Sequence, residues 1–288
     1  MNILIKMKNN GKAETTIHFT RKALQFLAKH ADLNNPEQVK QFIANHEVSN
    51  HYKRNLCIAY NKYLEHTNQT WNMPLYRQPS KMPNIPTTAK LNMLISHAGK
   101  HLALRLKISM ETGLRPIEVM RLKVKDVNFE TRTLQPATAK NGAPRMIKLS
   151  IQTTAMLKAH ISKYKRTQHD KIFKGTSDNY GKLFRQMRNN LAEKLQDPTI
   201  RNIRLYDLRH YYATRLYSKT KDILLVKQQM GHKKLETTLI YTQLLHFNEE
   251  DEYTCKTATN IKQATKLIEN GFQYITEIDG TKLFRKRK

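Results

Sequence analysis

The sequence predicts a mainly α-helical protein with a small antiparallel sheet, an α+β fold class, divided into more than one domain. Three observations predict this. Apolar residues recur at helical spacing through most of the chain, four of the nine prolines fall between residues 74 and 86, and the last forty residues change to a strand, helix and hairpin pattern. At 288 residues there is room for two cores. We expect a helical domain at 1–72, a Pro-rich linker at 73–86, a larger domain at 87–247 and a β-α-β-β appendage at 248–288.

Three helices are expected in residues 1–72. Apolar side chains share one helix face from Phe19 to Leu27. Asn35-Pro36 is typical of a helix cap followed by a first turn, and Ser49 is a cap for a third helix that runs through Tyr63. These helices are expected to form a small bundle.

The larger domain begins with helices at 91–98 and 102–110, the second ending at Gly113 as a left-handed cap. Two strand-like segments, 133–139 and 145–149, then flank Asn141-Gly142, which predicts a hairpin with Lys140 at the edge of its turn. Helical patterns dominate from there through Tyr241. One apolar stripe is expected on the helix that carries Leu205, Leu208, Tyr212 and Leu216.

The tail reads as a strand at 253–259, a helix at 260–271 that ends at Gly271, and a hairpin at 272–284 that turns at Asp279-Gly280. Residues 285–288 have the sequence RKRK. They are expected to form a frayed, solvated end, and a phosphate contact is the alternative.

The charge of the chain points to a polyanionic partner. Lys and Arg number 51 against 23 Asp and Glu, a formal net charge of +28 that exceeds what solubility requires. Residues 80–248 hold 32 basic and 11 acidic residues, and therefore +21 of this charge. DNA or RNA is the expected partner, ahead of an anionic membrane.

Composition also excludes several classes of protein. Cys57 and Cys255 are too few for a disulfide framework and lack the spacing of a zinc site. There is no run of 18 apolar residues, and the first ten residues lack the apolar core of a signal peptide. We expect a cytoplasmic, nucleoid-associated protein with no membrane contact. Without HExxH, CxxC or paired carboxylates near a histidine, no metal site is expected, and a metal-dependent nuclease is set aside.

Five residues carry a coherent chemistry: Arg115, Lys140, Arg209, His232 and Tyr241. Two guanidinium groups can hold the non-bridging oxygens of a phosphodiester. A lysine can protonate a leaving alkoxide, a histidine can donate to the transition state, and a phenol can attack phosphorus.

These residues lie in three short motifs. TGLRPIEVMRL at 112–122 places Glu118 three residues after Arg115, where it can orient the guanidinium. RLYDLRHYYATRLY at 204–217 places Tyr206, Arg209 and His210 on one helix face. GHKKLETTLIYT at 231–242 places a loop histidine nine residues before a tyrosine on the following helix.

Each motif alone has an ordinary structural explanation. Arg-Glu pairs on helices are usually surface ion pairs, and a single His or Tyr is more often a capping or core residue. The joint spacing is what favours a site. The lysine follows the first arginine by 25 residues, and the histidine and the tyrosine follow the second arginine by 23 and 32.

With these motifs the chain resembles the tyrosine recombinases, the integrases and Xer-like resolvases that share their strand-cutting logic with type IB topoisomerases. The resemblance covers about residues 1–247 and is strongest at 110–122, 204–217 and 231–242. The tail is similar to that of archaeal integrases.

The resemblance implies a role for each residue. Arg115 and Arg209 would clamp the phosphate, Lys140 would be the general acid for the 5′ hydroxyl, His232 a second donor and Tyr241 the nucleophile. Around them, Glu118 would support the site and His210 would brace its helix. Tyr206 departs from the family pattern, which usually has His or Lys three residues before the second arginine. A phenol can donate a hydrogen bond to phosphate, but it relays protons poorly at neutral pH.

The resemblance implies a site-specific DNA recombinase, an integrase or excisionase of a mobile element, that works through a 3′-phosphotyrosyl intermediate. Double-stranded DNA would be the substrate, a homotetramer on two DNA sites the assembly, and no cofactor would be needed. Three alternatives stay open: an Xer-like chromosome-dimer resolvase, a topoisomerase-like relaxing enzyme, and a non-cutting DNA-binding protein on the same scaffold.

Overall fold

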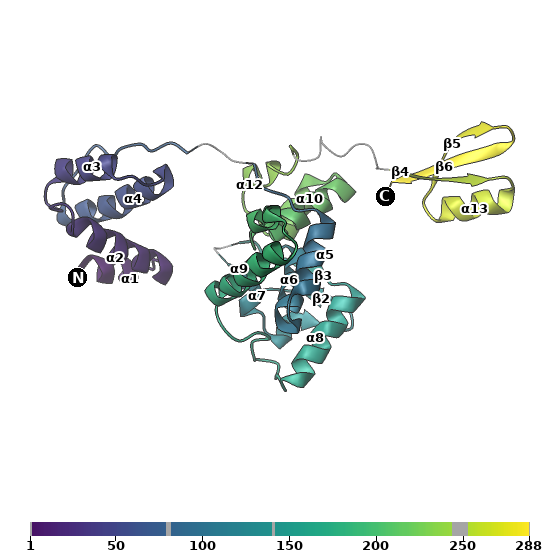
Figure 1. The fold of residues 1–288 in the computed structure, drawn as a ribbon, viewed down its shortest axis with the longest axis horizontal. Helices are drawn as coiled ribbons and strands as arrows, with labels where there is room; N and C mark the ends of the chain where they lie inside the picture. Colours follow the sequence, from purple (N-terminus) through teal and green to yellow (C-terminus); the bar gives the residue numbers. More distant parts are fainter. Residues whose placement is uncertain (1, 79–81, 140–141, 244–252, 288) are drawn as a thin grey trace. The chain divides into compact units, whose positions relative to one another are not determined.

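The computed structural model describes residues 2–78, 82–139, 142–243 and 253–287. The chain divides into two compact units, residues 1–81 and 82–288. Helices dominate both, and the strands form two small antiparallel sheets (Figure 1). The predicted fold class is confirmed.

The first unit contains four helices: α1 (Asn2–Asn9), α2 (Glu14–Ala28), α3 (Pro36–Asn45) and α4 (Asn50–Thr67). The sequence patterns missed α1. The caps are as predicted, because the Asn35 side chain accepts from the backbone N–H of Gln38 and the Ser49 hydroxyl accepts from that of Tyr52. The core between the helices is fully buried at Leu27, Val39, Ile43, Leu56 and Tyr60.

The second unit begins with α5 (Thr88–His97), α6 (Lys100–Thr112) and α7 (Pro116–Arg121). A short 3₁₀ turn (Val124–Asp126) leads into three strands, β1 (Val127–Asn128), β2 (Thr133–Leu134) and β3 (Ile147–Lys148). After the strands come α8 (Ile151–Lys163), α9 (Ser177–Lys194), a second 3₁₀ turn (Pro198–Asn202), α10 (Asp207–Thr220), α11 (Ile223–Met230) and α12 (Glu236–Leu239).

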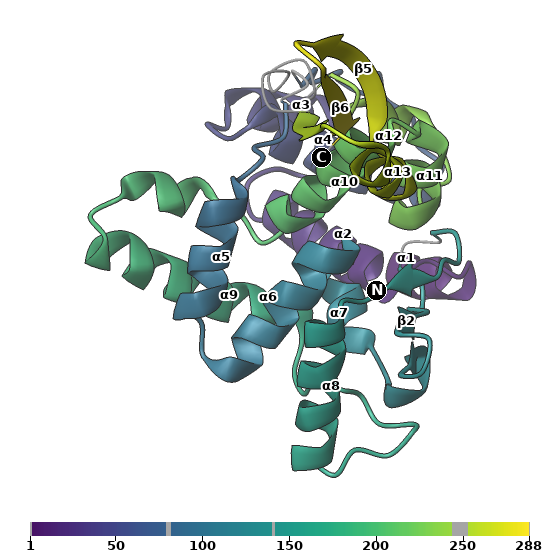
Figure 2. The same cartoon turned by 90° about the vertical axis from the view of Figure 1, so that its right-hand side faces the viewer.

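Helix α6 lies at the centre of this arrangement and contacts α5, α7, α8, α9 and α10. Figure 2 shows it between α5 and α8. Its buried residues Leu104, Leu106 and Ile108 belong to the main core of the unit. A second cluster, built on Ala213, Val226, Met230 and Tyr241, packs beside it.

Helix α10 is shared by the two clusters, and this corrects the predicted single stripe. Leu208 is buried in the main core and Leu205 packs against it, whereas Tyr212 and Leu216 pack against the second cluster. A side chain on α10 that points between the clusters is therefore enclosed by both. Arg209 occupies such a position and is 1% exposed.

The predicted hairpin is only partly correct. β2 and β3 do pair antiparallel, but through two residues each, Thr133 with Lys148 and Leu134 with Ile147. The segments that follow β2 and precede β3 bond elsewhere: the N–H of Ala139 donates to Glu118, and that of Ala143 donates to the carbonyl of Gly231. Lys140 and Asn141 lie outside the described residues.

Gly113 ends α6 with φ of 62°, as predicted for a left-handed cap. A Cβ there would lie 2.5 Å from Cδ1 of Tyr212. We expect Gly113→Ala to destabilise the protein by more than about 1 kcal/mol, because backbone strain and a side-chain clash add. Urea unfolding measures this. Gly181→Ala, inside α9 with only the flexible end of Arg185 nearby, is the control and is expected to stabilise by roughly 0.5–1 kcal/mol. If both substitutions changed the free energy of unfolding by similar amounts, Gly113 would not be a strained position.

The tail contains β4 (Tyr253–Ala258), α13 (Ile261–Glu269), β5 (Gln273–Ile278) and β6 (Thr281–Arg287), in the sheet order β4-β6-β5. The predicted β-α-β-β elements and the turn at Asp279-Gly280 are confirmed, since both turn residues have positive φ. The predicted frayed end is wrong, because β6 continues to Arg287, which pairs with Tyr253. Lys288 lies outside the described residues. No helix in the described ranges combines the length and apolar character needed to cross a membrane.

Candidate active site

Three segments that are distant in sequence meet around Arg209. They are the start of α7 with Arg115, the first turn of α10 with Arg209 and His210, and the stretch from the end of α11 through α12 with His232 and Tyr241. Arg209 Nη2 lies 3.1 Å from His232 Nε2, and His210 Nδ1 lies 3.1 Å from the Tyr241 hydroxyl. Arg115 is close enough to act electrostatically on both Arg209 and Tyr241.

Arg209 is held by the carboxyl ends of two helices. Its Nη1 donates to the carbonyl of Gly113 at 2.5 Å, and its Nη2 donates to that of Met230 at 2.6 Å. Helix C-termini carry partial negative charge, which favours a cation there. Burial and the charge of Arg115 lower the pKa of Arg209 to about 10, so it is still charged at neutral pH. Contacts within the described residues use three of its five N–H groups, which leaves up to two for a phosphate.

His232 follows Gly231, the left-handed cap of α11. Because a guanidinium cannot accept, Nε2 of His232 accepts from Arg209, and Nδ1 carries the proton and donates to Thr238 Oγ1 at 3.0 Å. Burial and the charges of Arg209 and Arg115 lower its pKa to about 4, so the ring is neutral at pH 7. To donate to a phosphate through Nε2, the ring must take the other tautomer, with the Thr238 hydroxyl donating to Nδ1. Thr238 is fully buried, and no feature of the sequence indicated its contact with His232.

Glu118 is a buried carboxylate beside Arg115. It accepts from the guanidinium and the backbone N–H of Arg115, each at 2.9 Å, and from Arg145 Nη2 at 2.7 Å. The N–H of Ala139 also donates to it. Burial acts to raise the pKa of Glu118, but the charge of Arg145 and these hydrogen bonds outweigh it, and the pKa is lowered. Glu118 therefore orients Arg115, as predicted, and joins it to Arg145.

Sequence reasoning missed Arg145, although this arginine is 5% exposed and touches the site. The available signal was a basic residue at the start of a predicted strand that contains buried Ile147 and Leu149. A basic side chain at such a position usually faces solvent, and when it is buried it is usually paired with a carboxylate. Here Arg145 is paired with Glu118.

Replacing Arg145 by Met is expected to destabilise the protein by about 3–5 kcal/mol at pH 7, because it removes one partner of a buried ion pair. The exposed pair Arg201–Glu193 supplies the control. Arg201→Met is expected to cost less than about 1 kcal/mol.

The pH dependence of the same variant gives a second test. A carboxyl with a lowered native pKa stabilises the fold above its unfolded pKa of about 4.3, and this contribution is lost as pH falls through the native pKa. Unfolding measured from pH 7 to pH 3 should therefore show the gap between wild type and Arg145→Met narrowing in acid. A gap that is constant with pH would mean that the charge of Glu118 is not involved.

Tyr241 lies two residues past the end of α12, in a turn rather than on the helix that the sequence predicted. It is 2% exposed, and burial raises its pKa to about 12, against the opposing charge of Arg209. Its hydroxyl contacts His210, which was expected only to brace its helix. The structure thus places His210 at the phenol itself.

Tyr206 stands at the amino-terminal cap of α10 and is 43% exposed. Its ring packs edge-on against His210 with 5.3 Å between centroids. Tyr206 and His210 are therefore in contact one turn apart, as their spacing predicted, whereas Arg209 is buried between them and the core.

Ala139 and Gly142, which flank Lys140 and Asn141 in the sequence, lie at the cluster around Arg209. Ala139 bonds to Glu118, and a Cβ on Gly142 would lie 3.1 Å from the carbonyl oxygen of Gly231 and 3.7 Å from Nη1 of Arg115. In the part of the chain that the structure describes, no group of three or more His, Cys, Asp and Glu side chains could hold a metal ion.

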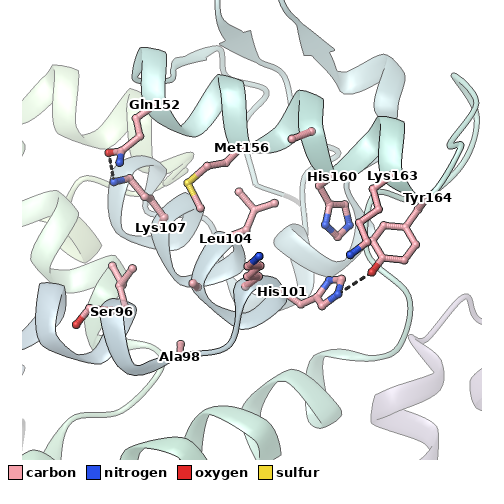
Figure 3. A pocket seen from close by; sticks show the side chains of 14 residues that line it. Ser96, Ala98, His101, Leu104, Lys107, Gln152, Met156, His160, Lys163 and Tyr164 are labelled. Atoms are coloured by element: carbon pink, nitrogen blue, oxygen red, sulfur yellow. Dashed lines mark hydrogen bonds between the residues drawn. The ribbon is translucent and has the colours of Figure 1, made fainter.

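A separate cavity of about 570 Å³ opens between α6 and α8 (Figure 3). Apolar side chains such as Leu104 and Met156 line it, and two hydrogen bonds, Lys107 to Gln152 and Tyr164 to His101, cross between the helices. None of the cluster residues described above lines this cavity. The cavity is therefore not the site of the phosphate chemistry that the cluster suggests.

Known proteins are similar to this chain in sequence and in fold. The chain is 29% identical over 148 residues to tyrosine recombinase XerA of Saccharolobus solfataricus and 30% identical over 179 residues to XerA of Pyrococcus horikoshii. These matches cover 51% and 58% of this chain, but only 47% and 59% of the relatives.

Among solved structures, the Tn1549 transposon integrase in complex with circular intermediate DNA matches with a TM-score of 0.67 at 15% identity, covering 93% of this chain and 98% of that one. XerH recombinase bound to a palindromic difH substrate matches with a TM-score of 0.59 at 20% identity, covering 79% of this chain and 76% of that one. These likenesses establish the fold. The model of the phage integrase family matches residues 84–246, which hold the whole cluster around Arg209, and the chain belongs to that family.

Proposed function

We propose that this protein is a site-specific DNA recombinase that cuts and rejoins double-stranded DNA through a 3′-phosphotyrosyl intermediate at Tyr241. The observation that carries the proposal is the convergence of Arg115, Arg209, His232 and Tyr241 on one buried cluster. The net charge of +28 supports a nucleic acid as the substrate.

In this proposal the two arginines bind the non-bridging oxygens of the scissile phosphate and stabilise the charge that grows on them in the transition state. His232 donates a further hydrogen bond in its second tautomer, and Lys140 protonates the leaving 5′ oxygen. The positions of Ala139 and Gly142 beside Glu118, Gly231 and Arg115 support that assignment of Lys140. No nucleotide cofactor is needed, since the phosphotyrosyl bond conserves the energy of the bond that is cut.

We further propose a division of labour between the domains. Residues 1–72 would bind DNA together with a catalytic domain at 87–247, joined by the linker at 73–86. Four copies would assemble on two DNA sites, as an integrase or excisionase of a mobile element in the cytoplasm. A chromosome-dimer resolvase is supported by the likeness to the XerA relatives.

Trapping of a covalent complex tests the proposal. Duplexes selected from a random pool by binding are nicked close to the site of cleavage, so that the cut fragment diffuses away, and the products are run on a denaturing gel. We expect a protein-DNA adduct from wild type. Tight binding without any adduct would instead support the non-cutting DNA-binding protein.

A plasmid with two copies of the selected site separates the remaining candidates. Recombinant circles are expected from a recombinase, whereas relaxed circles alone would favour a topoisomerase-like enzyme.

A further inference from the structure

Tyr241 keeps its proton at neutral pH, which is a problem for a nucleophile. Burial raises its pKa to about 12 even though Arg209 and Arg115 act in the opposite direction. A phenol that attacks phosphorus must lose this proton during the step, and a base in hydrogen-bond reach lowers the barrier. The cluster must therefore contain an acceptor for the proton, or the reaction depends on rare phenolate.

His210 is the acceptor that the geometry offers. Its Nδ1 lies 3.1 Å from the Tyr241 hydroxyl, and the two ring centroids are 5.9 Å apart. His210 sits on α10 directly after Arg209, so the helix that positions the buried arginine also positions the imidazole.

Two other side chains of the cluster are less suited to the task. His232 has both ring nitrogens engaged, with Arg209 and with Thr238. Tyr206 ends in a phenol, which is a poor base at neutral pH.

We propose that His210 is the general base for attack by Tyr241, an inference that rests on the proposed function. The proton of the Tyr241 hydroxyl passes to Nδ1 of His210 while the bond from the phenol oxygen to phosphorus forms. The bond from phosphorus to the 5′ oxygen breaks, and that oxygen takes a proton from Lys140. The imidazole ends as imidazolium and the ammonium as amine, and rejoining reverses both transfers.

The surroundings of His210 fit this role. Burial lowers its pKa, and the charges of Arg204 and Arg209 act in the same direction, so the ring is neutral and able to accept at pH 7. Asp207, buried one turn earlier on α10, opposes them and stabilises the imidazolium once it forms. From other elements, His232 and Tyr241 face the ring, and the Tyr206 ring packs on it.

His210→Asn tests the proposal, because asparagine places a hydrogen-bonding atom near the position of Nδ1 but cannot take a proton. The rate of adduct formation is measured from pH 6.5 to 9 on ordinary duplexes. It is also measured on duplexes with a 5′-bridging phosphorothiolate, whose sulfur leaves without protonation. Lys140→Ala is the matched control for the other side of the reaction.

We expect His210→Asn to lower the rate by about 10²–10⁴ at pH 7. Without the base, the rate of His210→Asn should follow the fraction of phenolate and rise about tenfold for each unit of increasing pH. Its deficit relative to wild type should therefore shrink by the same factor. The phosphorothiolate should restore Lys140→Ala and leave His210→Asn slow, because sulfur replaces the need for an acid and not for a base.

Three results would overturn the role of His210 alone, with wild type still forming its adduct. The first is a rate of adduct formation by His210→Asn within threefold of wild type. The second is a loss of rate that is the same at every pH, which indicates only a structural contact. The third is a rate faster than wild type, which indicates that His210 holds the phenol inactive. Failure of wild type to form an adduct would overturn the proposed function and this step with it.

Discussion

Tyr241→Phe is expected to form no covalent complex with DNA while it still binds DNA within about twofold of wild type. The substitution removes only the hydroxyl, and with it the one atom that the proposed mechanism joins to phosphorus. The aromatic ring stays in the second cluster of the core, beside Val226 and Met230. Loss of the hydrogen bond to His210 should change stability by about 0.5–1.5 kcal/mol. Adduct yield, binding and unfolding are measured on the same preparation.

Tyr164→Phe is the matched control for that result. Tyr164 lies just after α8, and its hydroxyl also bonds to a histidine, His101, at the cavity away from the cluster. It should form the adduct at the wild-type rate. If Tyr241→Phe cleaved DNA at a rate similar to wild type, Tyr241 would not be the nucleophile.

Arg209→Lys is expected to slow adduct formation by about 10²–10³, the effect of removing a donor aimed at transition-state charge. Lysine keeps the charge but cannot reach the Gly113 and Met230 carbonyls and a phosphate together, because it lacks the planar fork of the guanidinium. Leaving these carbonyls without a partner should also lower stability by about 1–3 kcal/mol. Single-turnover rates at saturating enzyme, with urea unfolding alongside, check both parts.

Arg215→Lys, on the exposed side of α10, is the control for the loss at Arg209. It should leave both the rate and the stability close to wild type. The phosphate-clamping role of Arg209 would be contradicted if Arg209→Lys cut DNA within threefold of wild type while folded.

The pattern of residues predicted the main elements of the fold, because caps and apolar spacing are local signals. The Asn35 and Ser49 caps and the turn at Asp279-Gly280 are of this kind. The site residues were named from the joint spacing of three motifs and from the family resemblance, and their roles stay predictions. Contacts between distant segments were not predictable. The division of α10 between two clusters depends on where α11 and α12 pack. The spacing of apolar residues within α10 carries no information on that packing.

The same reason explains the site residues that were missed. Arg145 matters because it meets Glu118 across 27 residues, and Thr238 because it meets the ring of His232. His210 was assigned to bracing since its position beside Arg209 shows only which helix it is on. Its contact with Tyr241 requires the fold that brings α10 to the turn after α12.

The most direct test of the account is to find which residue carries the DNA. The trapped adduct is digested with nuclease and trypsin and sequenced by mass spectrometry. Cleavage after Lys234 and Lys256 gives one peptide that contains both Tyr241 and Tyr253. We expect a nucleotide remnant on Tyr241, joined through its 3′ phosphate. A remnant on Tyr253, Tyr206 or any other residue, or a linkage to the 5′ end of the DNA, would contradict it.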